Sequence, residues 1–372
     1  MKIIQVLAIV FLVSIIGGCC GVGSIQDLKT ITLPSARTPA ATIYLIGDAG
    51  EVSGSATVLR QVKQDIDTML DSSATQPEIG IIFLGDNIYP EGLREQDLAA
   101  IDAQLGILYN MPVKGWFVPG NHDWAREGPE GFTRILAQGA YINSVVENSG
   151  GKINAELLPS GGRPGPAVRN IGDLVTVVFL DSQWWLHTYS RGVTVEDAQK
   201  MRTAAVDSLH SILTKAGDTP VIIAAHHPLR TRGEHNKNTW YDRFFLTRHQ
   251  DTNDKLYRSY IHDLHSVFQS FENNPQIYAA GHDHSLQVFD GAPDYVSGVT
   301  LVSGSGSKLT KVSHDSDLHF FAGKGNAEKG FMRVNVYDDK SLDIMVFTEN
   351  NDGSSDGHLY QPAALRYIWP NP

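Results

Sequence analysis

The chain has 372 residues, enough for one large domain or two small ones, and its apolar content of 42% allows a sizeable buried core. Its formal net charge is -11 at pH 7, so it lacks the basic face that nucleic-acid-binding proteins normally carry, and we expect no nucleic-acid partner. The charge does not exclude an anionic substrate, because a bound cation can reverse the local field.

The first residues are typical of an export signal rather than of a folded domain. Lys2 is followed by the largely apolar residues 3–16. This stretch is shorter than the roughly 20 residues of a membrane-spanning helix and suits the roughly 7–15 apolar residues of a signal peptide. Ile-Gly-Gly-Cys at residues 16–19 resembles a bacterial lipobox, which predicts a lipoprotein-type signal over residues 1–19, acylation of Cys19 and attachment to the cell envelope. A soluble periplasmic or secreted protein is the alternative.

The rest of the chain is expected to form a single domain. Cys19 and Cys20 are the only cysteines, so the sequence offers no disulfide framework or thiolate metal site beyond the signal. Residues 20–39 are polar and aperiodic, as in a linker, and residues 40–365 are expected to form the domain. The sequence leaves the oligomeric state open.

From residue 41 onward, short apolar runs alternate with longer amphipathic segments, a pattern of strands joined by crossover helices. Several runs are apolar at nearly every position, as in strands buried on both faces. The expected strands are residues 42–46, 79–84, 113–118, 174–180, 221–225 and 276–280, with two more around an Asp-Asp turn in residues 331–349. The expected helices are residues 55–70, 194–217 and 257–275. The sequence therefore predicts an α/β fold.

Two segments show no clear period. Residues 148–166 are rich in glycine and proline, and residues 230–255 are long, polar and aromatic. Loops of this length in a compact domain are usually functional lids or disordered, so we expect these two to form the wall of a substrate pocket.

Five of the expected strands are followed by residues of the types that bind metal ions. These residues are Asp48, Asp86, Asn121 with His122 and Asp123, His226 with His227, and His282 with Asp283 and His284. Glycine precedes the key residue in four of the five places, which lets the backbone turn sharply. Each piece alone could be an ordinary polar turn. Ligand sites in open α/β sheets lie at the carboxyl ends of strands, so their coincidence predicts a metal centre.

The composition of this set constrains the metal. Carboxylates, an amide and imidazoles without sulfur suit Zn, Fe or Mn. One ion cannot use so many ligands and still leave a position open for substrate. Two ions about 3.5–4 Å apart can do so if one carboxylate bridges them.

Five ordered motifs resemble those of the calcineurin-like metallophosphoesterase superfamily. They are Gly-Asp-Ala-Gly at 47–50, Gly-Asp-Asn-Ile-Tyr at 85–89, Gly-Asn-His-Asp at 120–123, Ile-Ala-Ala-His at 223–226 and Gly-His-Asp-His at 281–284. The resemblance implies a four-layer α/β/β/α sandwich, in which helices flank two mixed sheets, and makes residues 40–365 a catalytic domain.

The motifs are most similar to those of the purple acid phosphatase branch. Many members of the superfamily carry a histidine ligand two residues after the first aspartate, where this chain has Gly50. Purple acid phosphatases instead use a tyrosinate from Gly-Asp-x-x-Tyr, and Tyr89 occupies that position. The alternative is that Tyr89 only packs ahead of Pro90.

Carried over by position, the resemblance implies two ligand sets that share Asp86. The first metal ion would be held by Asp48, Asp86, Tyr89 and His284, and the second by Asp86, Asn121, His226 and His282. The implied ions are Fe(III) at the first site and Fe, Zn or Mn(II) at the second. His122 matches a residue that contacts substrate and leaving group. His235, nine residues after His226, matches a further catalytic histidine of the small members of the branch.

The implied activity is hydrolysis of small phosphate monoesters by attack of a metal-bound hydroxide, with His122 and His235 assisting the leaving group. A phosphodiesterase or nucleotide pyrophosphohydrolase with the same metal centre is the second hypothesis. A non-catalytic binding lipoprotein at the cell surface is the third. The membrane would be contacted only through the lipid anchor or signal peptide.

Overall fold

The computed structural model describes residues 37–72, 75–236, 250–271, 275–290, 298–313, 318, 320–322, 329–349 and 355–360. The predicted signal peptide and most of the predicted linker lie outside these residues. Among the described helices, none combines the length and the apolar character needed to cross a bilayer.

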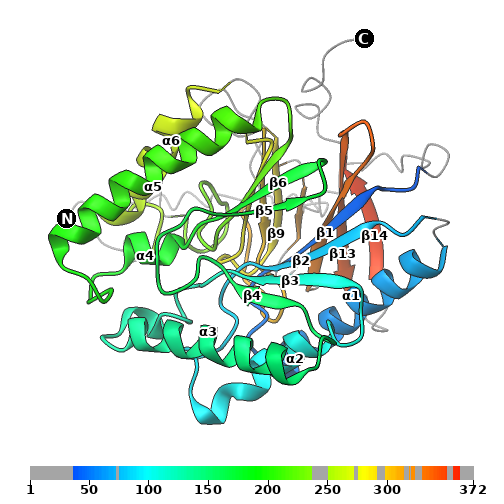
Figure 1. Cartoon of the computed structure of the whole chain (residues 1–372), viewed down its shortest axis with the longest axis horizontal. Helices are drawn as coiled ribbons and strands as arrows, with labels where there is room; N and C mark the ends of the chain where they lie inside the picture. The colour runs from blue at the N-terminus through cyan, green and yellow to red at the C-terminus, as the bar shows by residue number, and fades with distance from the viewer. Residues whose placement is uncertain are drawn as a thin grey trace, which may run out of the picture.

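Two mixed sheets of seven strands each lie at the centre of the described structure (Figure 1). The strands of the first are β1 (Ala41–Ile46), β2 (Glu78–Phe83), β3 (Val113–Phe117), β4 (Ala155–Leu157), β12 (Gly330–Val336), β13 (Leu342–Glu349) and β14 (Ser355–Tyr360). The strands of the second are β5 (Ala167–Ile171), β6 (Val175–Phe179), β7 (Val221–Ala224), β8 (Ile277–Ala280), β9 (Leu286–Asp290), β10 (Val299–Ser303) and β11 (Phe320–Ala322). Their orders are β14-β13-β12-β1-β2-β3-β4 and β11-β9-β10-β8-β7-β6-β5.

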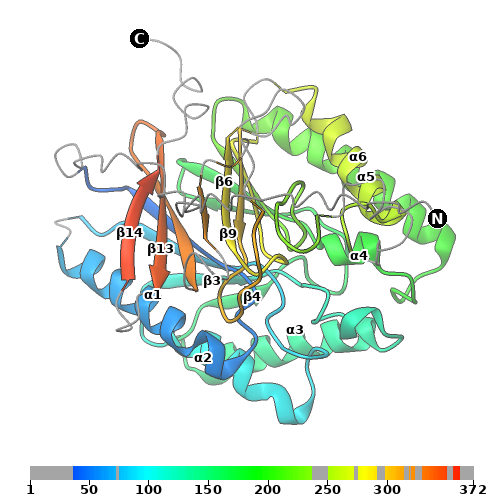
Figure 2. The same ribbon diagram turned by 180° about the vertical axis from the view of Figure 1, so that it is seen from behind.

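Helices cover the outer faces of both sheets, as Figures 1 and 2 show from opposite sides. The first sheet is covered by α1 (Val52–Ser72), α2 (Leu98–Gly106) and α3 (Gly131–Asn148). The second is covered by α4 (Ser182–Leu186), α5 (Val195–Ala216) and α6 (Lys255–Phe268). Two short 3-10 helices are η1 (Glu95–Asp97) and η2 (Ala125–Glu127). The predicted α/β/β/α sandwich is therefore confirmed.

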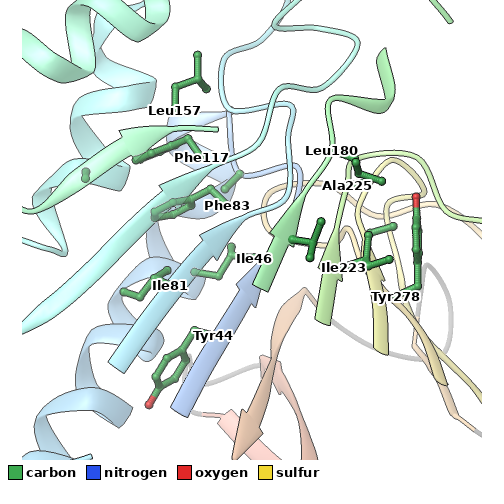
Figure 3. Packing of buried hydrophobic residues seen from close by; sticks show 14 of the residues in the cluster. Tyr44, Ile46, Ile81, Phe83, Phe117, Leu157, Leu180, Ile223, Ala225 and Tyr278 are labelled. Carbon is green, nitrogen blue, oxygen red and sulfur yellow. The ribbon is translucent and has the colours of Figure 1, made fainter. Parts of the chain in front are cut away.

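The apolar strands are buried on both faces because alternate side chains enter different layers. Leu45 of β1 and Ile222 of β7 belong to the cluster between the two sheets. Their neighbours Tyr44, Ile46 and Ile223 belong to the cluster that the sheets form with the helices. Figure 3 shows part of this second cluster.

The parallel strands of each sheet bring their carboxyl ends to one edge. β1, β2 and β3 are parallel neighbours in the first sheet, and β6, β7 and β8 are parallel neighbours in the second. The motifs that follow β1, β2, β3, β7 and β8 therefore meet where the sheets face each other.

The predicted ends of the α5 helix agree with the structure, whereas the predicted end of the α6 helix does not. At the start of α5, Thr194 accepts a hydrogen bond from Asp197 N at 3.0 Å, and Gly217 ends the helix with a φ of +54°. The prediction that the last helix reaches residue 275 is wrong, because α6 ends at Phe268. Beyond it, Ser270 N and Phe271 N bond to carbonyls three residues back, which tightens the chain into turns.

One of the two aperiodic segments also differs from expectation. Residues 148–166 are not wholly irregular, because they contain β4, which pairs in parallel with β3. This strand is too short to show a period in the sequence. Of residues 230–255, the central stretch 237–249 lies outside the described residues. The predicted pair of strands in 331–349 is confirmed as β12 and β13.

Replacing Leu45 by Ala tests the layer between the sheets. Leu45 is fully buried, so the variant is expected to lose about 2–5 kcal/mol of unfolding free energy, measured by urea denaturation. Leu136→Ala is the matched control, because Leu136 on α3 is 42% exposed and the change should stay within about 0.5 kcal/mol. Equal losses in the two variants would contradict the assigned packing.

Candidate metal centre

Backbone hydrogen bonds hold the strand-end motifs together at the edge where the two sheets meet. Asp48 N donates to Gly85 O at 3.0 Å and joins the motifs after β1 and β2. Gly281 N donates to His226 O at 3.0 Å and joins the motifs after β8 and β7. Gly47 N donates to Ser303 O of β10 at 2.7 Å, which links the first sheet to the second.

Glycine is required at these turns because the backbones touch. A Cβ on Gly47 would lie 2.9 Å from Gly281 Cα, and one on Gly120 would lie 2.2 Å from Asp86 N. Gly85 also has a φ of +88°, which other residues rarely adopt. The glycines of the motifs after β1, β2, β3 and β8 thus allow these four loops to approach at backbone distance.

Three predicted ligands have left-handed backbone conformations. The φ angles are +59° at Asp48, +52° at Asp86 and +71° at His282. Such a conformation costs on the order of 1 kcal/mol or more for a residue with a side chain and persists only where its surroundings enforce it. It turns each side chain inward directly after its strand.

Asn121, His226 and His282 form a cluster of hydrogen-bond acceptors. His226 Nδ1 donates to Leu84 O at 2.8 Å, and His282 Nε2 donates to Gln250 O at 3.2 Å. When both rings are neutral, the other ring nitrogens, His226 Nε2 and His282 Nδ1, therefore carry lone pairs. His226 Nε2 and His282 Nδ1 lie 3.3 Å apart and 3.0 and 3.2 Å from Asn121 Oδ1. Three acceptors that face one another without a hydrogen repel unless a cation lies among them.

Asp48, Tyr89 and His284, predicted for the first ion, form the first cluster, and the three acceptors Asn121, His226 and His282 are the second cluster. Tyr89 Oη donates to Asp48 Oδ1 at 3.1 Å and lies 3.1 Å from His284 Nε2, which is 3.4 Å from Asp48 Oδ1. The other carboxylate oxygen of Asp48 accepts a hydrogen bond from His282 N at 2.8 Å. Burial and the two carboxylates of Asp48 and Asp86 raise the pKa of Tyr89, so a phenolate here needs a strong cation beside it.

Asp86 lies between the two clusters. Its Oδ1 is 3.4 Å from His226 Nε2. Its carboxylate, the carboxylate of Asp48 and the imidazole of His284 form a set that could hold a metal ion. Burial raises its pKa, but His226 and His122 in their protonated forms, together with the hydrogen bond from His122 N, outweigh burial and lower the pKa to about 2. The carboxylate is therefore ionised and available to both sites.

Gly50 has no room for a histidine, which explains the departure from the superfamily motif. A Cβ there would lie 2.6 Å from both Asp86 O and Ile88 N. Gly50 N donates to Asp86 O at 3.0 Å, and Tyr89 N donates to Gly50 O at 3.3 Å. The loop after β2 thus occupies the space of a side chain at residue 50 and places Tyr89 in the first cluster.

The two predicted catalytic histidines lie beside the clusters. His122 Nδ1 donates to Pro90 O at 2.6 Å, which leaves His122 Nε2 3.8 Å from Asp86 Oδ2. His235 stacks on His282 with ring centroids 4.0 Å apart, and its Nδ1 lies 3.1 Å from Asp251 Oδ1.

Two further residues at the centre were not assigned roles from the sequence. Asp123 is buried and accepts hydrogen bonds from Asn87 N, Ile88 N and Gly120 N, which tie the loops after β2 and β3 together. Asp123 belongs to the third motif, and this position in the sequence could have indicated that it lies at the centre. The ammonium of Lys308 lies 3.3 Å from the centroid of the Tyr89 ring, and no motif marks this lysine.

The chemistry of these residues fits a pair of cations. The seven predicted ligands come together as two clusters joined by the ionised carboxylate of Asp86. The proton positions of His226 and His282, fixed by backbone carbonyls, point lone pairs into the second cluster.

Comparisons with known proteins agree with this fold. Residues 41–286 match a family model described as calcineurin-like phosphoesterase, whose fold implies a dinuclear metal site. No curated protein matches the chain by sequence. A solved structure described as that of PhoD is 11% identical with a TM-score of 0.53, covering 88% of this chain and 69% of that chain. The phosphopantetheinyl hydrolase PptH from Mycobacterium tuberculosis is 12% identical with a TM-score of 0.35, covering 73% and 92%. The likeness to PhoD supports the fold alone.

Asp86→Asn tests the shared carboxylate. The amide keeps the size of the side chain and the acceptor for His122 N but removes the charge, so the variant is expected to lose both ions on dialysis. Metal analysis of the dialysed protein measures the loss. Asp71→Asn, at an exposed position of α1, should retain two ions. Two ions and full turnover in the Asp86 variant would rule out a bridging role.

Proposed function

Since the chain belongs to the calcineurin-like phosphoesterase family, it is a metal-dependent phosphoester hydrolase, and we propose that its substrates are small phosphate monoesters. The observation that carries the proposal is the pair of ligand clusters on either side of Asp86. Both clusters lie at the carboxyl ends of the strands, where substrate sites of α/β sheets form.

We propose Fe(III) at the cluster of Asp48, Tyr89 and His284, because phenolate and carboxylate are hard donors. Fe, Zn or Mn(II) would suit the imidazole and amide donors of the second cluster. When bound, the two ions would lower the pKa of a coordinated water and offset the charge of the phosphoryl oxygens.

His122 is proposed to protonate or stabilise the departing alkoxide. Its hydrogen bond to Pro90 O fixes the ring, and the ring lies edge-on to Tyr89 with centroids 4.4 Å apart. The proton for the leaving group would therefore be carried by the other nitrogen, His122 Nε2, which lies 3.8 Å from Asp86 Oδ2. His235 would contact the leaving group from the side of His282, since its ring is held by Asp251.

Positive charge at the site favours a monoester over a diester. A monoester dianion carries one more negative charge than a diester. Lys308 lies over the Tyr89 ring, and Lys308 and Arg126 are close enough to His122 to lower its pKa, after burial, which is the main cause. These two cations are positioned to attract the additional charge.

Hydrolysis of an aryl phosphate and of a bis-aryl phosphate separates the two substrate classes. The proposal predicts a higher kcat/KM for the monoester. It also predicts that Lys308→Ala lowers kcat/KM for the monoester alone by about tenfold, equivalent to about 1.4 kcal/mol. Lys311→Ala is the matched control, since Lys311 is exposed in the same segment. A higher kcat/KM for the diester in the parent protein would contradict the proposal and indicate a phosphodiesterase with the same metal centre.

The visible spectrum of the purified protein tests Tyr89 as a ligand. Iron bound by a tyrosinate gives a charge-transfer band, which Tyr89→Phe should abolish, whereas Tyr109→Phe, at an exposed tyrosine, should leave it unchanged. A colourless, iron-free and active parent protein would exclude the proposed iron and the purple acid phosphatase branch.

A further inference from the structure

A path of hydrogen bonds leads from the start of α4 to the second cluster. Ser182 Oγ accepts from His227 N at 3.0 Å and lies 2.8 Å from His227 Nδ1. His227 Nε2 lies 2.5 Å from Gln250 Oε1, and the backbone oxygen of Gln250 accepts from His282 Nε2 at 3.2 Å. Neither Ser182 nor His227 has a role in the reaction proposed above.

The hydrogens along this path can be placed from the chemistry of the partners. An amide oxygen only accepts, so His227 Nε2 carries a hydrogen and donates it to Gln250. Because Ser182 Oγ already accepts from His227 N, its own hydrogen is available for His227 Nδ1. A carbonyl oxygen likewise only accepts, so His282 Nε2 carries a hydrogen. The lone pair of His282 Nδ1 therefore faces Asn121.

Both ring nitrogens of His227 are occupied by these bonds. The ring lies near the second cluster, since its centroid is 4.4 Å from that of His282, and His226, His227 and His282 could by distance alone hold an ion. A ligand must offer a free lone pair, and His227 has none to offer. Its role is therefore to support the neighbouring ligand.

Gln250 shows why this support is needed. Its φ is +80°, a conformation that a residue with a side chain rarely adopts, and it aims the backbone oxygen at His282. The residue is buried, and its side chain is anchored by His227. The short bond between the two side chains thus holds the carbonyl that orients the metal ligand.

We propose that His227 and Gln250 are positioning residues of the second metal site, where they fix the tautomer and the ring orientation of His282. The inference rests on the proposed dinuclear centre. The inference predicts that a change at His227 or Gln250 weakens metal binding at the second site and not at the first. The reason is that, among the described residues, the first cluster has no bond to this pair.

Zinc titration of the metal-free protein against a chromophoric chelator tests the inference. Gln250→Leu removes the acceptor and is expected to weaken the second Zn²⁺ by about tenfold or more, with the first within about twofold. His227→Phe keeps the ring volume and should have the same selective effect. Gln250→Glu keeps an oxygen acceptor and should bind both ions like the parent. Gln199→Leu, at an exposed position of α5, is the matched control.

The possible failures are distinguishable. If the parent binds two ions and Gln250→Leu binds both with unchanged affinity, the positioning role is wrong and the dinuclear centre stands. Equal losses at both sites, or no recovery in Gln250→Glu, would indicate a general structural effect and also overturn the role. If the parent itself binds fewer than two ions, the proposed function fails and the inference fails with it.

Discussion

Lone pairs face one another at the edge where the two sheets meet, and this repulsion is the constraint on which the site depends. Asn121 Oδ1, His226 Nε2 and His282 Nδ1 lie within 3.0–3.3 Å of each other, and backbone carbonyls hold the hydrogens of both rings on their far sides. The ionised Asp86 adds a negative charge beside them. A cation that shares these electrons stabilises the arrangement.

The fold supplies this arrangement at the cost of backbone strain. Two sheets present parallel strand ends to one edge, and glycines such as Gly47 and Gly281 let the loops approach at backbone distance. Asp48 and Asp86 then adopt left-handed conformations that their neighbours enforce. Asp123, which accepts hydrogen bonds from the loops after β2 and β3, is one of the residues that offset the strain.

The strands could be predicted from their apolar runs, and the sandwich and the seven side chains from the resemblance of the motifs that follow these runs. Asp86, for example, follows an apolar run and a glycine, and strand order then determines that it meets His226. Lys308 and Gln250 could not be predicted, since their approach depends on the path of loops without a period. The predicted end of α6 is wrong for a related reason. The helical spacing of apolar residues continues past Phe268 in the sequence. In the structure, Ser270 N and Phe271 N donate hydrogen bonds to carbonyls three residues back, and these turns end the helix.

Anomalous diffraction from crystals of the metal-loaded protein tests the central claim most directly. The account predicts two peaks about 3.5–4 Å apart, with an oxygen of Asp86 between them. One peak would contact Asp48, Tyr89 and His284, and the other Asn121, His226 and His282. A single peak, or two peaks that do not share Asp86, would contradict it.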